Sequence, residues 1–234
     1  MVWQSPFELS ISEFEAYLLE SYIPKTKSDI RLYNGEYHES KIENTLKFAP
    51  YLNRVEAWAL SMYLGPTEYY ANLNQYLRGK KTENPLKYKL IAKAATIGLI
   101  KIPPINVELI KSWKQPNPVA YKSLKRYGRV RGIAQYQVNE KIREKGFVST
   151  TYWQDIRGLI ERYAVSANVV FRINPNSVKS EGRFIDPIKL KNQEGEILFP
   201  PGVEFQVTEI LEKEYFKNES AGTIKVTYIA MDEL

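Results

Sequence analysis

Two consecutive prolines, Pro103 and Pro104, divide this sequence into two parts of different character. Proline lacks a backbone N–H and fixes its φ angle, so a helix does not continue through such a pair. Before the prolines, apolar residues recur at helical spacing, whereas after them many apolar residues alternate with polar ones in short runs. The pattern predicts an α+β fold, with a helical lobe over 1–104 and a mostly antiparallel β lobe over 105–234 in a single domain.

The first part carries start and stop signals for several helices. A Ser-x-x-Glu pattern begins one segment, and a proline begins another that ends in glycine. Helices are expected at 10–22, at 39–65 as two helices broken near Pro50, at 66–79 and at 84–104.

The second part is predicted to be mainly strands, with two helices among them. Strands are expected at 117–125, 147–151, 167–173, 182–186, 195–199, 203–210 and 223–231. The helices are expected at 129–146, which ends in basic residues and glycine, and at 152–165, which is amphipathic.

The composition excludes several kinds of active site. The chain has no cysteine and one histidine, His38, so a thiol nucleophile, a disulfide, a histidine triad and a His/Cys zinc site cannot be built. The amino-terminal residues lack the basic and apolar regions of a signal peptide. No apolar run approaches the roughly 20 residues that span a membrane.

The net charge of +6 is spread along the chain. A basic surface of this kind is more often a solvated face than a nucleic-acid site, so binding to nucleic acid is not expected. The same charge would steer an anionic cofactor toward the protein.

The stretch "EGE" at 194–196 places two carboxylates beside an apolar strand. If the strand extends through both glutamates, Glu194 and Glu196 lie on the same side of the sheet, two residues apart. A solvated start of a strand is the alternative interpretation. Like charges on one face are unfavourable, and "STT" at 149–151 lies upstream, which together favour a functional pair.

The segments "GFVSTT", "VVFRIN" and "EGEILFPPGVEFQV" occur in an order that resembles the mono-ADP-ribosyltransferases of the arginine–serine–glutamate type. That group includes the enzyme components of binary toxins and the vertebrate ecto-ADP-ribosyltransferases. The resemblance covers about residues 66 to 231. It implies a two-sheet β lobe packed on helices, with NAD bound as a substrate between the lobes.

The resemblance implies a role for each residue of the two motifs. Glu196 matches the catalytic glutamate, which stabilises the positive charge that develops on the ribose as nicotinamide leaves. Glu194 matches a residue that receives an arginine acceptor, because a carboxylate can accept a guanidinium in two parallel hydrogen bonds. Ser149 would hold Glu196, while Thr150 and Thr151 complete the motif beside NAD; a plain strand is the alternative interpretation of these three residues.

Further NAD contacts are implied by the segment "YYANLNQYLRG" at 69–79. Tyr70 and Asn74 are four residues apart on one helix face, and Asn74 and Arg78 match residues that contact the pyrophosphate or adenosine. Tyr163 matches an aromatic residue near nicotinamide. For all four residues, an ordinary amphipathic helix or a core position is the alternative interpretation.

The sequence departs from the family pattern on the strand at 117–125. The pattern calls for an aromatic residue followed by an arginine that binds the NAD phosphates, and this chain has Tyr121 followed by Lys122. Lysine keeps the charge but loses the planar fork that contacts phosphate in two places. Lys122 is the expected contact, and the alternatives are a neighbouring arginine (Arg126, Arg129 or Arg131) or a weakened relative.

These features predict an NAD-dependent mono-ADP-ribosyltransferase that modifies a protein, with arginine as the expected acceptor residue. No metal is expected at the site, because nicotinamide is already cationic in NAD. By analogy with the family, the chain is a candidate toxin or effector, either secreted or injected. The rival hypothesis is an inactive relative that binds NAD, another protein or nucleic acid. The acceptor protein and the oligomeric state are not indicated.

Overall fold

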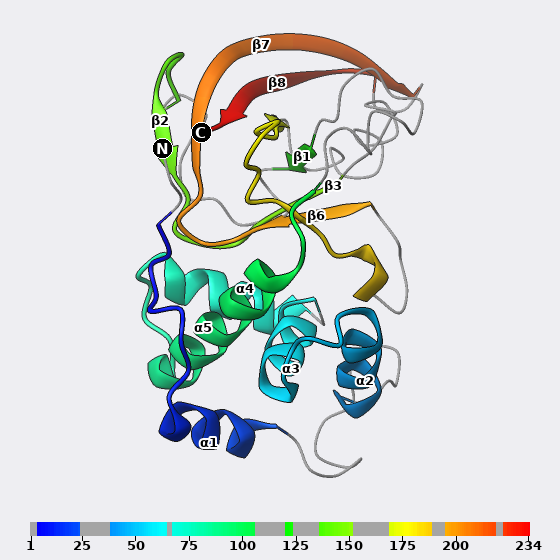
Figure 1. The fold of residues 1–234 in the computed structure, drawn as a ribbon. Helices are drawn as coiled ribbons and strands as arrows, with labels where there is room; N and C mark the ends of the chain where they lie inside the picture. Colours follow the sequence, from blue (N-terminus) through cyan, green and yellow to red (C-terminus); the bar gives the residue numbers. More distant parts are fainter. Residues whose placement is uncertain are drawn as a thin grey trace.

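The structure is a computed structural model of the chain. It describes residues 4–23, 38–64, 67–105, 120–123, 136–151, 169–188, 195–218 and 222–234. A helical lobe packs below a β lobe, and the amino-terminal segment runs alongside both (Figure 1). The predicted α+β architecture is therefore confirmed.

The helical lobe follows the predicted order of elements. In the described residues it contains α1 (Glu13–Tyr22), α2 (His38–Phe48), α3 (Arg54–Tyr63), α4 (Thr67–Leu77) and α5 (Pro85–Lys101). Ser12 and Asn53 begin α1 and α3, each in a reciprocal capping box with a glutamate three residues on. Asn84 caps α5, whose first residue is a proline. The predicted break near Pro50 separates α2 from α3.

The β lobe contains eight strands within the described part of the chain. They are β1 (Ala120–Ser123), β2 (Lys141–Arg143), β3 (Val148–Thr151), β4 (Val169–Asn174), β5 (Arg183–Phe184), β6 (Glu196–Phe199), β7 (Glu204–Asn218) and β8 (Gly222–Glu233). A short 3-10 helix, η2 (Asp186–Ile188), follows β5.

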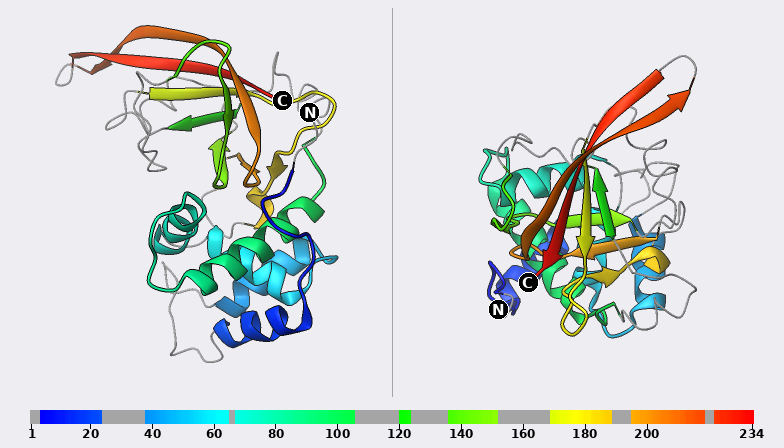
Figure 2. Two further views of the ribbon diagram at one scale, coloured as in Figure 1. Left: turned by 90° about the vertical axis from the view of Figure 1, so that its left-hand side faces the viewer. Right: turned by 90° about the horizontal axis from the view of Figure 1, so that it is seen from above.

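The strands are hydrogen-bonded in the order β2-β7-β8-β4-β1-β3-β6-β5. Tyr121 opposite Thr151 is the residue pair that links β1 to β3. The strands that precede this link in the order, β2-β7-β8-β4-β1, run across the strands that follow it, β3-β6-β5, as Figure 2 shows. The order therefore divides into two sheets, and in the part of the chain that the structure describes every strand pair is antiparallel except β4 with β8.

The smaller sheet, β3-β6-β5, lies between two hydrophobic cores because its side chains alternate between faces. Phe147 and Leu198 pack into the core of the helical lobe. Val148 and Phe199 pack into a second core with Phe171 of β4. This arrangement fixes β3 and β6 from both sides.

The helix predicted at 129–146 is wrong for the part of that range that the structure describes. The chain instead forms a turn, in which Asn139 has a φ of +70°, and then strand β2. Ile142 of β2 is directly opposite the fully buried Phe205 of β7. Pairing with this distant strand outweighs the local helical propensity. The helix predicted at 152–165 lies outside the described residues.

None of the helices in the described ranges combines the length and the apolar character needed to cross a membrane.

Candidate functional site

A serine and a glutamate on neighbouring strands form the centre of the candidate site. Glu196 is the first residue of β6, and Ser149 is the second residue of β3. The Ser149 Oγ hydroxyl donates a hydrogen bond to Glu196 Oε1. Ser149 is 4% exposed and Glu196 is 7% exposed, so this polar pair is held in a largely dry setting. The two residues that the resemblance pairs are therefore in direct contact.

The other two residues of the "STT" motif hold different positions. Thr150 is buried, and its Oγ1 donates to the backbone oxygen of Ile197, 2.7 Å away. This bond ties β3 to β6 in addition to the backbone ladder. Thr151 is directly opposite Glu196 in the register of the two strands.

An aspartate that the sequence analysis did not single out holds the backbone at the start of β6. Asp186, at the beginning of η2, is 5% exposed. Its Oδ1 accepts from the Glu196 N–H at 2.8 Å, and its Oδ2 accepts from the Gly195 N–H at 2.5 Å. Gly195 has a φ of +63°, which favours glycine and turns the chain into the strand. The sequence signal for Asp186 is only an Asp-Pro pair after a short strand.

The predicted face of α4 lies against the segment that leads into β3. A Cβ atom on Gly146 would come within 2.5 Å of Asn74 Oδ1 and 3.4 Å of Arg78 Nη2. Gly146 precedes Ser149 by three residues. The structure therefore brings Asn74 and Arg78 close to the strand that carries the serine.

Asn74 is buried and contacts Tyr63, which belongs to a group of aromatic side chains. Its Nδ2 lies 3.4 Å from the Tyr63 hydroxyl, and its Oδ1 is buried without a hydrogen-bond partner. Tyr70, one helical turn earlier, packs on the helical core with its ring 6.3 Å from the Tyr63 ring. Tyr63 in turn contacts Phe147, with ring centroids 4.7 Å apart.

The two candidate residues of β1, Tyr121 and Lys122, are opposite different residues of the neighbouring strands. Tyr121 is opposite Thr151 on one side and Arg172 of β4 on the other. Lys122 is opposite Phe171, which is fully buried in the second core. Arg172 is half-buried, and its Nε is buried without a hydrogen-bond partner.

Several predicted residues lie outside the described part of the chain. They are Glu194, Tyr163, Arg126, Arg129 and Arg131.

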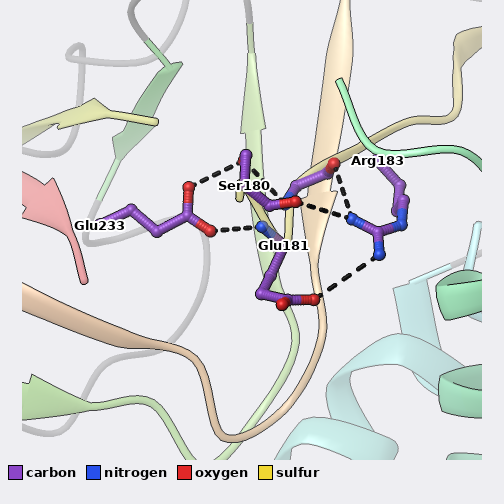
Figure 3. A network of polar contacts seen from close by, with 5 residues as sticks. Ser180, Glu181, Arg183 and Glu233 are labelled. Carbon is purple, nitrogen blue, oxygen red and sulfur yellow. Dashed lines mark hydrogen bonds and ion pairs between the residues drawn. The ribbon is translucent and has the colours of Figure 1, made fainter. Parts of the chain in front are cut away.

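A buried polar network braces the strand next to β6 (Figure 3). Glu233, near the end of β8, accepts hydrogen bonds from the backbone N–H of Glu181 and from the Ser180 hydroxyl, both at the segment before β5. Arg183 of β5 donates to the backbone oxygen of Ser180 at 3.0 Å and lies 3.6 Å from the Glu181 carboxylate. Burial raises the pKa of Glu233 to about 7, although the hydrogen bonds that it accepts oppose this shift.

The comparison with models of protein families gives one match. Residues 35–232 match the family model described as ADP-ribosyltransferase exoenzyme. No curated protein matches the sequence.

Among solved structures, the enzymatic component C2-I of the Clostridium botulinum C2 toxin is 16% identical with a TM-score of 0.58, and the match covers 83% of this chain and 47% of C2-I. The ADP-ribosylating toxin BECa of C. perfringens is 18% identical with a TM-score of 0.57, over 87% of this chain and 50% of BECa. The Vis toxin of Vibrio splendidus is 16% identical with a TM-score of 0.53, over 98% of this chain and 88% of Vis.

These identities support a shared fold, and the chain spans about half the length of C2-I and BECa. The family match covers most of the sequence and includes both Ser149 and Glu196. The chain belongs to the ADP-ribosyltransferase exoenzyme family.

Proposed function

We propose that the protein cleaves NAD between nicotinamide and ribose and transfers the ADP-ribosyl group to an arginine of an acceptor protein. The observation that carries this proposal is the buried hydrogen bond between Ser149 Oγ and Glu196 Oε1. Family membership supports the reaction class, and the contact between these two residues supports Glu196 as the catalytic residue.

Glu196 acts on the ribose of NAD. As the bond from ribose C1′ to nicotinamide breaks, its electron pair leaves with nicotinamide and C1′ becomes positively charged. A carboxylate that accepts a hydrogen bond from the ribose 2′-hydroxyl interacts more strongly as this charge grows. One such interaction at about 4–5 Å, with an effective dielectric constant of 20, is of order 3–4 kcal/mol, or some hundreds-fold in rate.

Glu194 receives the acceptor. A guanidinium nitrogen forms the new bond to C1′ and loses one proton, which the Glu194 carboxylate takes up or passes to solvent. A carboxylate suits this acceptor because it can pair with guanidinium through two hydrogen bonds.

The remaining candidates bind NAD. Asn74, Arg78 and Tyr70 come from α4, which lies against the segment before Ser149. We assign Lys122 and Tyr121 of β1 to the phosphates of NAD, and Thr150, Thr151 and Tyr163 to the surroundings of its nicotinamide ribose. The net charge of +6 assists the approach of the anionic dinucleotide.

The acceptor and the biological setting follow by analogy. The BECa structure contains NADH, and that protein is described as an ADP-ribosylating toxin of a binary enterotoxin. We therefore assign to this chain an effector role on a protein target.

A transfer assay tests the proposal. The protein is incubated with NAD labelled in its adenylate part and with a mixture of candidate acceptor proteins, beside Glu196→Gln and Glu194→Gln. The wild type is expected to label protein, Glu196→Gln to lose both labelling and NAD hydrolysis, and Glu194→Gln to lose labelling while keeping hydrolysis. Equal loss of both activities in Glu194→Gln would contradict the acceptor role of Glu194.

Lys122 favours one second candidate function, an NAD-binding protein without transferase activity, because lysine is a weaker phosphate clamp than arginine. Wild-type protein that binds NAD but neither hydrolyses nor transfers it would establish this alternative.

A further inference from the structure

Asp186 contacts the backbone on which Glu196 sits, although it is ten residues away in sequence. Its two carboxylate oxygens accept from two successive N–H groups, those of Gly195 and Glu196. The backbone oxygen of Glu196 accepts from the Ile185 N–H at 3.1 Å. The peptide groups on both sides of the Glu196 Cα are therefore held by the same short segment.

A carboxylate is well suited to this position. The two N–H groups are adjacent donors, and the carboxylate accepts from each of them with a separate oxygen. An asparagine of the same shape offers one oxygen and one NH₂ group, so one N–H would face another donor. Because Asp186 is 5% exposed, water has little room to replace the lost acceptor.

The helical lobe supports the segment that carries Asp186. Asn44 of α2 donates through Nδ2 to the backbone oxygen of Ile188 at 2.9 Å, in the last residue of η2. Ile188 and Ile185 are buried in the helical core. A continuous set of contacts thus runs from α2 through η2 to the start of β6.

Two independent contacts therefore fix Glu196. Ser149 orients the side-chain carboxylate, and Asp186 holds the backbone from which that side chain projects. We infer that Asp186 is a positioning residue for Glu196, an assignment that rests on the function proposed above. Asp186 touches no substrate in this assignment, so its loss should slow the reaction without weakening the binding of NAD.

Kinetics of NAD hydrolysis test this inference, using Asp186→Asn and the matched control Asp232→Asn. Asp232 is exposed on β8, and its carboxylate accepts from Asn174. We expect kcat per NAD-binding site to fall about 10- to 100-fold in Asp186→Asn, since a displacement of about 1 Å in a reacting group has effects of this size. KM and the stoichiometry of NAD binding should stay within twofold, and Asp232→Asn should match the wild type.

Amide hydrogen exchange supplies a readout besides activity. In Asp186→Asn at least one of the Gly195 and Glu196 amides should exchange about 10-fold faster or more, because the amide that faces the new NH₂ group loses its acceptor and its local protection. Asn44→Ala loosens η2 without changing Asp186 itself. It should lower kcat and raise the exchange rates of the Gly195 and Glu196 amides, each by a smaller factor than Asp186→Asn does. This second variant covers the case in which Asp186→Asn fails to fold.

Three outcomes would overturn the inference. In the first, wild-type protein cleaves NAD and Asp186→Asn has unchanged kcat, which refutes the positioning role alone. In the second, exchange at Gly195 and Glu196 is unchanged, which removes its structural basis. In the third, wild-type protein neither binds nor cleaves NAD, which refutes the proposed function and this inference with it.

Discussion

Ser149→Ala is the substitution that most directly probes the contact at the centre of the site. It removes the hydroxyl that donates to Glu196 Oε1 between two residues that are 4% and 7% exposed. A hydrogen bond to a charged group contributes about 1.5–3 kcal/mol. If this energy is lost in the transition state, kcat for NAD hydrolysis falls about 10- to 150-fold.

The assay measures nicotinamide release from NAD and separates kcat from KM. Ser149→Thr keeps a hydroxyl and should recover most of the loss, which distinguishes a lost hydrogen bond from a general defect. Ser61→Ala is the matched control, because Ser61 is equally buried and donates to the backbone oxygen of Trp58 within α3. It should lower the free energy of unfolding by about 1 kcal/mol and leave kcat unchanged.

A kcat of Ser149→Ala within twofold of the wild type would refute a catalytic contribution of this hydrogen bond. A Ser149→Thr variant as slow as Ser149→Ala would also refute it, because the hydroxyl would then not be the group that matters.

Three further predictions concern NAD binding and stability. Lys122→Ala should raise the Kd for NAD, measured by calorimetry, about 10-fold or more. If Arg172→Ala raises the Kd further than Lys122→Ala does, the phosphate contact comes from β4, where the Arg172 Nε is buried without a hydrogen-bond partner. Gly146→Ala should lower the free energy of unfolding by about 1–3 kcal/mol and raise KM for NAD, because its Cβ would lie 2.5 Å from Asn74 Oδ1; unchanged KM would show that α4 does not contact NAD. Because the pKa of Glu233 is raised to about 7, the folded state binds the Glu233 proton more tightly than the unfolded state does. The free energy of unfolding should therefore fall by roughly 3 kcal/mol as the pH rises from about 4.5 to about 7. Urea unfolding of wild type and Glu233→Gln between these pH values tests this prediction. If the free energy of unfolding changes with pH equally in the two proteins, the prediction is contradicted.

The order of elements could be predicted because their signals are local. Ser12 caps α1 within the segment that the Ser-x-x-Glu pattern predicted as a helix, and the predicted break near Pro50 separates α2 from α3. The pairing of Ser149 with Glu196 was also accessible, although through resemblance to a family and not through spacing. Forty-seven residues separate the two, and no local rule relates them.

The features that sequence reasoning missed depend on contacts between distant segments. β2 was predicted as part of a helix, because its own residues have helical spacing and its partner β7 lies more than sixty residues further along. Asp186 looked like the end of a strand before a loop. Its function as an acceptor for two N–H groups depends on where η2 packs against α2 and on the turn at Gly195. Neither feature has a pattern that a single sequence displays.

The central claim is that Glu196 stabilises the ribosyl cation formed from NAD. The most direct measurement is the rate of nicotinamide release from NAD alone, per NAD-binding site, in wild type and Glu196→Gln. We expect a decrease of some hundreds-fold in Glu196→Gln, with the Kd for NAD within about twofold of the wild type. Equal rates in the two proteins, or a wild type that binds NAD and releases no nicotinamide, would contradict it.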